Sequence, residues 1–119
     1  PPNKDKTMRN EDRFWFDLGP LDSIPKRGAR TVRTPRREIA VFRTASDEFF
    51  ALENRCPHKG GPLSEGIVHG RKVACPLHNW IIDLESGDAT GADRGCARAF
   101  PVKLENGRIY LDMGVAAAA

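Results

Sequence analysis

The sequence is poor in cysteine and in long apolar stretches. Its three cysteines cannot all pair with one another, and in a cytosolic chain cysteines spaced with histidines are more often metal ligands than disulfide partners. The apolar runs are short, such as IAVF at 39–42, whereas a membrane-spanning helix needs roughly 18 residues. The first residues, PPNKDKTMRNEDR, are charged and contain no apolar stretch typical of a secretory signal. We therefore expect a cytoplasmic protein that does not associate with a membrane.

The sequence also lacks the dense basic stripe that is typical of nucleic-acid-binding proteins. The net charge is only +3, and the basic residues of the N-terminal third are scattered among residues that alternate as in strands. These basic residues are Lys26, Arg27, Arg30, Arg33, Arg36 and Arg37. We expect no nucleic-acid partner. The basic residues form either a solvated face or a patch that meets an acidic protein partner.

No segment longer than a turn has the period of a helix, and the only candidate turn lies around 21–24. Short alternating segments predict strands instead. They cover 14–19, 29–34, 37–44, 48–54, 66–70, 71–75 and 80–89, with two more strands within 98–113. The last two flank Asn106 and Gly107, a dipeptide that favours a type I′ hairpin turn.

This pattern predicts one all-β domain over residues 1–119. The chain of 119 residues contains 11 glycines and 9 prolines, and its many short strands are typical of an antiparallel sandwich or barrel. We expect disorder at 1–12 and 114–119, where the residues are polar or only alanine-rich.

Two short loops combine cysteine with histidine. CPHKGG begins at Cys56 and includes His58, and CPLH begins at Cys75 and ends at His78. Two cysteines and two histidines satisfy tetrahedral zinc, but zinc fingers usually pair cysteine with cysteine and histidine with histidine. One cysteine and one histidine from each loop is the arrangement that a Rieske [2Fe–2S] centre needs. Zinc remains the alternative at this point.

CPHKGG and CPLHNW resemble the two cluster loops of the Rieske family. The resemblance implies two antiparallel sheets that form a base, with a cluster-binding subdomain inserted at roughly 54–99. It also implies one Rieske-type [2Fe–2S] cluster per chain. Cys56 and Cys75 would bind one iron, and His58 and His78 would bind the other.

The sequence departs from the Rieske proteins of respiratory complexes at four positions. Those proteins have a disulfide between their loops, whereas the matching residues here are Gly61 and Leu77. They also have a serine and a tyrosine after the second loop, where this chain has Trp80 and Ile82. The resemblance is therefore to the soluble, ferredoxin-like members of the family.

Other polar residues give weaker signals. His69 is expected at the surface, Cys96 is expected to be a buried packing thiol, and Trp80 is expected to shield the cluster. Three carboxylates near a turn show no spacing typical of acid–base catalysis, namely Asp83, Glu85 and Asp88. We predict no catalytic residue.

A finer resemblance concerns the partner system. CPHKGGPLSEGIVHG, CPLHNW, GADRGC and FPVKLENGRIYLDM are similar to the small subunit of assimilatory NAD(P)H-dependent nitrite reductase, over about residues 13–113. The resemblance implies one-electron transfer to a large flavo-sirohaem subunit that reduces nitrite to ammonium in nitrate assimilation. The alternatives are a Rieske ferredoxin of a ring-hydroxylating oxygenase and a zinc-stabilised interaction module.

Overall fold

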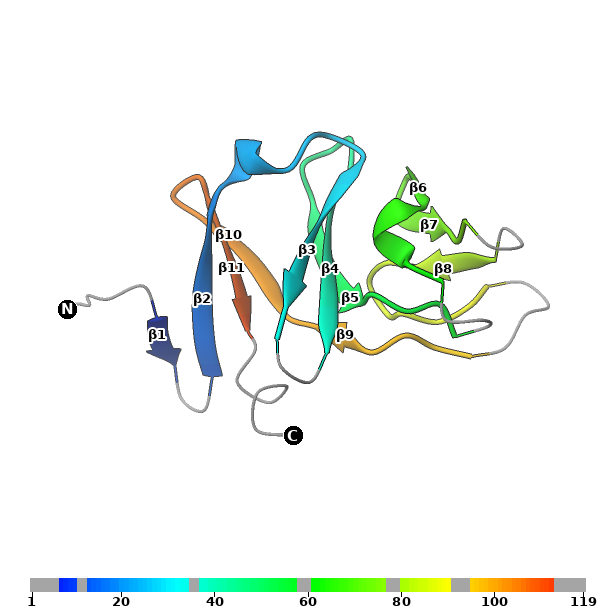
Figure 1. Cartoon of the computed structure of the whole chain (residues 1–119). Coiled ribbons are helices and arrows are strands. Elements are labelled where there is room, and N and C mark those ends of the chain that lie inside the picture. Colours follow the sequence, from blue (N-terminus) through cyan, green and yellow to red (C-terminus); the bar gives the residue numbers. More distant parts are fainter. Residues whose placement is uncertain are drawn as a thin grey trace.

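The computed structural model describes residues 7–10, 13–34, 37–57, 61–76, 80–90 and 95–112. These residues form three antiparallel sheets that follow one another across the molecule (Figure 1). The all-β prediction is confirmed, and the sheets do not close into a barrel. The described part contains no helix long and apolar enough to cross a membrane.

The first sheet joins the two ends of the described chain in the order β1-β2-β11-β10. Its strands are β1 (Thr7–Asn10), β2 (Arg13–Pro20), β10 (Val102–Glu105) and β11 (Arg108–Asp112). Asn106 and Gly107 connect β10 to β11 with φ values of 54° and 75°. Positive φ at both positions is what a type I′ turn requires, so the predicted hairpin is confirmed.

The second sheet is the central layer, in the order β3-β4-β5-β9. Its strands are β3 (Gly28–Arg33), β4 (Glu38–Arg43), β5 (Phe49–Glu53) and β9 (Ala99–Phe100). Ile39 and Val41 of β4 pack in one apolar cluster with Ile109 of the first sheet. Ala40 and Phe42 belong to a second cluster. Because successive side chains of a strand point to opposite faces, β4 is buried on both sides.

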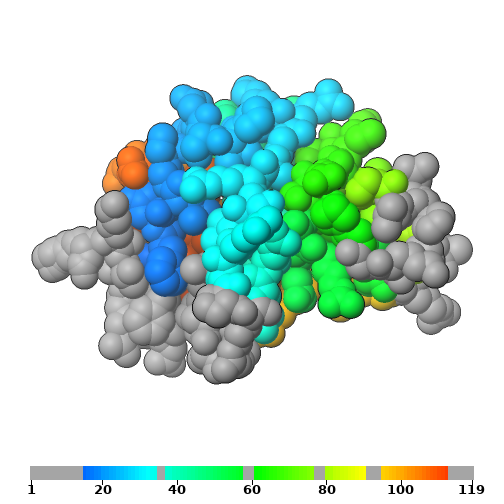
Figure 2. Space-filling view, viewed as in Figure 1, coloured from blue at the N-terminus to red at the C-terminus, as the bar shows by residue number. Residues whose placement is uncertain are grey.

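The third sheet is small and lies on the other side of the central layer (Figure 1). It contains β6 (Ile67–His69), β7 (Lys72–Ala74) and β8 (Ile81–Asp83), and the short 3-10 helix η2 (Leu63–Glu65) precedes it. Figure 2 shows the cyan surface of β3 and β4 packed directly against the green surface around η2. This sheet lies within residues 54–99, where the sequence predicts an inserted subdomain.

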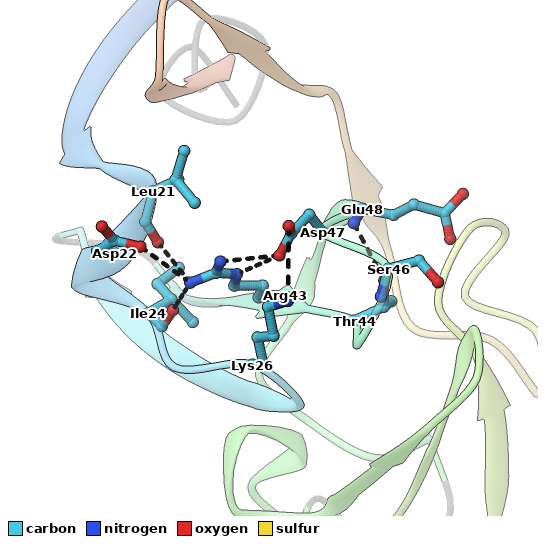
Figure 3. A network of polar contacts seen from close by, with 9 residues as sticks. All are labelled: Leu21, Asp22, Ile24, Lys26, Arg43, Thr44, Ser46, Asp47 and Glu48. Carbon is cyan, nitrogen blue, oxygen red and sulfur yellow. Dashed lines mark hydrogen bonds and ion pairs between the residues drawn. The ribbon is translucent and has the colours of Figure 1, made fainter.

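Arg43, at the end of β4, holds the turns at one end of the central sheet together (Figure 3). Its guanidinium donates to the carbonyl oxygen of Ile24 at 2.7 Å and to that of Leu21 at 3.2 Å. It also pairs with the Asp47 carboxylate at 2.8 Å. The carbonyls belong to the predicted helical turn, which is the 3-10 helix η1 (Leu21–Ser23) and its C-cap. The buried charge therefore connects two loops that are distant in sequence.

Two predicted segments differ from the observed ones. Within the segment 1–12, where the sequence predicts disorder, residues 7–10 form β1, whose backbone pairs with residues 13–16 of β2. The sequence predicts a strand over 80–89 with a turn at 86–88, whereas the observed strand ends earlier, at Asp83. There the carboxylate accepts hydrogen bonds from the N–H groups of Glu85 and Ser86, which turns the chain. The predicted disorder at 114–119 lies outside the described residues.

Candidate functional site

Cys56 and Cys75 occupy equivalent positions at the ends of two strands. Cys56 follows β5, and Cys75 follows β7 directly. Their exposed fractions are 1% and 0%, and both belong to the apolar cluster that fills the space between the central and third sheets. Other fully buried members of that cluster include Leu63, Ile82 and Leu84. The fold thus brings two thiols from opposite sheets into one water-excluded region.

The loop after each cysteine is closed by the same hydrogen bond. The N–H of Cys56 donates to the carbonyl oxygen of Gly61 at 2.8 Å, and the N–H of Cys75 donates to that of Trp80 at 2.7 Å. Each bond spans five residues, so the two loops have the same length between their fixed ends. The equal lengths of the two loops support the prediction that they act as a pair. In the sequence this pairing is visible only as two similar motifs.

Gly95 holds a third segment against the first loop. A Cβ atom at this position would lie 2.9 Å from Cβ of Pro57, and the φ of Gly95 is +135°. Both facts require glycine, because a side chain would collide and the backbone conformation is rare for other residues. The carbonyl oxygen of Gly95 also accepts a hydrogen bond from the N–H of Ala89 at 2.8 Å. Within GADRGC the described residues are Gly95 and Cys96.

The four predicted ligands are only half described. Cys56 and Cys75 lie together in the buried cluster, whereas His58 and His78 lie outside the described residues. Within the described ranges no three histidine, cysteine or acidic side chains gather as a metal site. The donors that are described fit an iron–sulfur cluster, because each buried thiol begins a closed loop whose sequence contains a histidine. The ligand assignment stays a prediction.

The side chains after the second loop are apolar at the site. Ile82 is fully buried in the same cluster as the two cysteines, and Trp80 is half-buried and packs against it. The placement of Trp80 agrees with the predicted shielding role. Neither side chain carries a hydroxyl group that can donate to a sulfur atom.

The acidic residues near the site have structural roles. The N–H groups of Ser86 and Glu85 donate to the carboxylate of Asp83, at 3.1 Å and 2.8 Å respectively. The hydrogen bond from Ser86 is the main reason that the pKa of Asp83 is lowered. The carboxylate of Glu85 pairs with Arg71 at 3.0 Å.

Cys96 is exposed, so the prediction of a buried packing thiol is wrong. A β-bridge pairs Cys96 with Asp88, which is also exposed, while the next residue, Ala97, is 4% exposed. The alternation of a strand places the thiol on the outer side. His69 is exposed as predicted.

Arg71 connects the small third sheet to the central one, a contact that no sequence pattern indicates. Its guanidinium lies 3.5 Å from the carboxylate of Glu48 and 3.0 Å from that of Glu85. It also lies over the ring of Phe50, 5.3 Å from the centroid. These partners are distant in sequence, so no local motif indicates them. The contacts join the turn before β7 to the start of β5 and to the turn after β8.

The sequence matches a known protein family over the region that contains both loops. A model of the Rieske [2Fe-2S] domain matches residues 14–101. The chain belongs to the Rieske [2Fe-2S] domain family. The zinc alternative is therefore set aside. A Rieske-type [2Fe–2S] cluster takes up and releases one electron, and this Rieske chain is an electron-transfer protein.

Several Rieske relatives are ferredoxin components of dioxygenase systems. The chain is 35% identical over 101 residues to the ferredoxin component of the naphthalene 1,2-dioxygenase/salicylate 5-hydroxylase systems of Ralstonia sp., covering 83% of this chain and 95% of that protein. It is 34% identical to the anthranilate 1,2-dioxygenase ferredoxin subunit of Burkholderia cepacia, covering 84% and 93% respectively.

Solved structures with the same fold come from more than one kind of system, as two of them illustrate. One is the complex of reduced oxygenase and oxidised ferredoxin in carbazole 1,9a-dioxygenase, with a TM-score of 0.74 and 25% identity over 87% of this chain and 94% of that one. The other is described as an NADH-dependent nitrite reductase small subunit from Mycobacterium tuberculosis. Its TM-score is 0.76, with 22% identity over 84% of this chain and 95% of that one. At 22% identity the second likeness shows the fold alone.

Proposed function

We propose that this protein is the ferredoxin component of a ring-hydroxylating oxygenase system. In this role it accepts single electrons from a reductase and passes them to a terminal oxygenase. The observation that carries the proposal is the 35% identity to a dioxygenase ferredoxin, in a match that covers 95% of that ferredoxin. The relatives thus favour the alternative of the sequence analysis over its main prediction, the nitrite reductase subunit.

The proposed ligands are Cys56 and Cys75 for one iron and His58 and His78 for the other. Two observations support this set. Both thiols are buried in one apolar cluster, and matching hydrogen bonds close the two loops. The cluster supplies one-electron chemistry when it is bound. The chain itself contributes burial, which keeps water from the thiolates, and loop geometry that fixes the ligand positions.

The small subunit of an assimilatory nitrite reductase is the second candidate. Its support is the similarity of four segments, including GADRGC, to that subunit. Only Gly95 and Cys96 of that segment are described, and Gly95 has a local structural reason to be glycine. GADRGC therefore discriminates between the two functions less well than its sequence suggests.

Copurification from the native host tests the choice between these functions. A tagged full-length protein is expected to bring down an oxygenase and a flavin-containing reductase. After reduction, it should pass its electron to that oxygenase in a single-turnover experiment. Recovery of a large flavo-sirohaem protein, with electron transfer to it, would contradict the proposal and support the nitrite reductase subunit.

A further inference from the structure

Most of the described basic side chains already form ion pairs or hydrogen bonds with other residues of the chain. Carboxylate oxygens lie within 4.0 Å of Lys26, Arg33, Arg43, Arg71, Lys103 and Arg108. Arg27 and Arg30 donate to the backbone carbonyl oxygens of Val68 and Leu18. Four of the six basic residues that the sequence singled out, Lys26, Arg27, Arg30 and Arg33, therefore have structural partners.

Three arginines differ from these. Arg37, Arg55 and Arg98 have no carboxylate within ion-pair distance among the residues that the structure describes. Nε of Arg37 is buried and has no hydrogen-bond partner among the described residues. We refer to Arg37, Arg55 and Arg98 together as the arginine surface.

Two of the three arginines lie against the same aromatic ring, and the third belongs to a segment that runs beside one of them. Cζ of Arg37 is 5.8 Å from the centroid of the Phe100 ring, and Cζ of Arg98 is 5.5 Å from it. The carbonyl oxygen of Arg98 accepts a hydrogen bond from the N–H of Glu53 at 2.7 Å, two residues before Arg55. Figure 1 shows the start of β4 beside β9, in agreement with these contacts. Two guanidinium groups therefore lie around one ring, and the exposed Arg55 lies on the segment that runs beside that of Arg98.

The arginine surface adjoins the first cysteine loop. Arg55 immediately precedes Cys56 in the sequence. The segment that contains Arg98 runs beside the one that contains Arg55, since β5 pairs with β9 and Gly95 packs on Pro57. A protein that binds the arginine surface would thus come close to the proposed cluster.

We propose that the arginine surface docks a carboxylate-rich face of the redox partner protein. The inference rests on the proposed electron-carrier function. Guanidinium groups bind carboxylates through two parallel hydrogen bonds, and clustered charge of one sign steers an oppositely charged partner during encounter. The described segments 37–38, 53–57 and 95–100 contain two carboxylates, the half-buried Glu53 and Glu38, and Glu38 already pairs with Arg33 at 3.0 Å. The positive charge therefore remains available for a partner.

A nucleic acid is a poorer fit for this surface. Single strands bind through basic grooves in which bases stack on accessible aromatic rings. The aromatic ring here belongs to Phe100, which is only 7% exposed and has two guanidinium groups near it. Three charges without a stacking ring favour recognition of carboxylates.

Binding of poly-L-glutamate to the full-length, cluster-loaded protein tests the surface directly. The test variant is Arg55→Gln with Arg98→Gln, and the matched control is Lys26→Gln with Lys72→Gln, which removes the same net charge elsewhere. At low ionic strength the test variant should bind about two- to thirtyfold more weakly, because each exposed charge pair contributes about 0.2–1 kcal/mol. The control should change affinity less than about twofold.

Two results would overturn the docking surface. In the first result, both double variants weaken poly-L-glutamate binding equally, which would mean that binding depends only on the net charge of the protein. In the other, single-stranded DNA with the same number of charges binds more tightly than poly-L-glutamate and loses affinity in the test variant. That result would identify a nucleic-acid surface.

Electron transfer to the copurifying oxygenase separates this inference from the proposed function. At low salt the test variant should transfer electrons about three- to tenfold more slowly than the control, and the difference should disappear at high salt because screening removes steering. Transfer by the wild-type protein with equal rates for both variants would refute the docking surface and leave the function intact. Absence of transfer by all forms, with selective poly-L-glutamate binding retained, would refute the function alone.

Discussion

Replacing Arg43 with alanine should destabilise the protein strongly, although this residue is far from any chemistry. The side chain of Arg43 is 7% exposed, and its guanidinium donates to the carbonyl oxygen of the fully buried Ile24 at 2.7 Å. A buried acceptor that loses its donor costs about 1–3 kcal/mol, and loss of the buried aliphatic stem costs about 1 kcal/mol more. The Asp47 side chain is 42% exposed, so losing this ion pair adds at most about 1 kcal/mol.

Together these losses predict a decrease of about 2–5 kcal/mol in the free energy of unfolding, which is a large part of the usual 5–15 kcal/mol. For a chain of this length the melting temperature should fall by about 8–20 °C. Chemical and thermal unfolding of the cluster-loaded protein, followed by circular dichroism, measures both quantities.

Two further variants make the Arg43 experiment decisive. Arg43→Lys keeps the charge for Asp47 but loses the planar fork, so its stability should lie between those of wild type and Arg43→Ala. Arg33→Ala is the control, because Arg33 also pairs with a carboxylate, at 3.0 Å, but its side chain is 83% exposed. Its unfolding free energy should change by less than about 1 kcal/mol. Equal effects of Arg43→Ala and Arg33→Ala would refute the reasoning from burial.

The remaining predictions concern the cluster. Cys56→Ser or His78→Ala should abolish iron binding. Either variant should also weaken amide-exchange protection mainly within 54–99, because metal binding is coupled to folding. If a variant keeps its normal iron content, the residue that it replaces is not a ligand. Cys96→Ser should keep its iron and its visible spectrum, and loss of both would show that Cys96 is a ligand. Trp80 and Ile82 provide no hydroxyl donors to sulfur, so the reduction potential should be about −150 to 0 mV and should stay flat around neutral pH. A midpoint above about +150 mV in a redox titration would show that other donors replace them.

Features that depend on neighbouring residues were predictable from the sequence. Asn106 and Gly107 adopt positive φ, which few other dipeptides tolerate, so the hairpin follows from local chemistry. The spacing of cysteine and histidine in two short loops likewise indicated the family. The first predicted strand contains Trp15, whose exposed fraction is 6%. The burial of this residue follows from the size of its side chain.

Features that depend on pairing between distant segments were not predictable. The exposure of Cys96 follows from its β-bridge to Asp88. Strand β1 forms because its backbone pairs with that of β2. The contacts of Arg71 with Glu48 and Glu85 bring together residues from three turns. The choice of partner system depends on such surface residues, which explains why the motifs identify the cluster more securely than the partner.

Anaerobic reductive titration, combined with iron, sulfide and zinc analysis of the same full-length sample, tests the central claim most directly. A Rieske electron carrier should contain about two iron atoms and about two sulfide ions per chain, and it should take up about one electron. Stoichiometric zinc without electron uptake, in protein produced with ample iron and sulfide, would contradict the account.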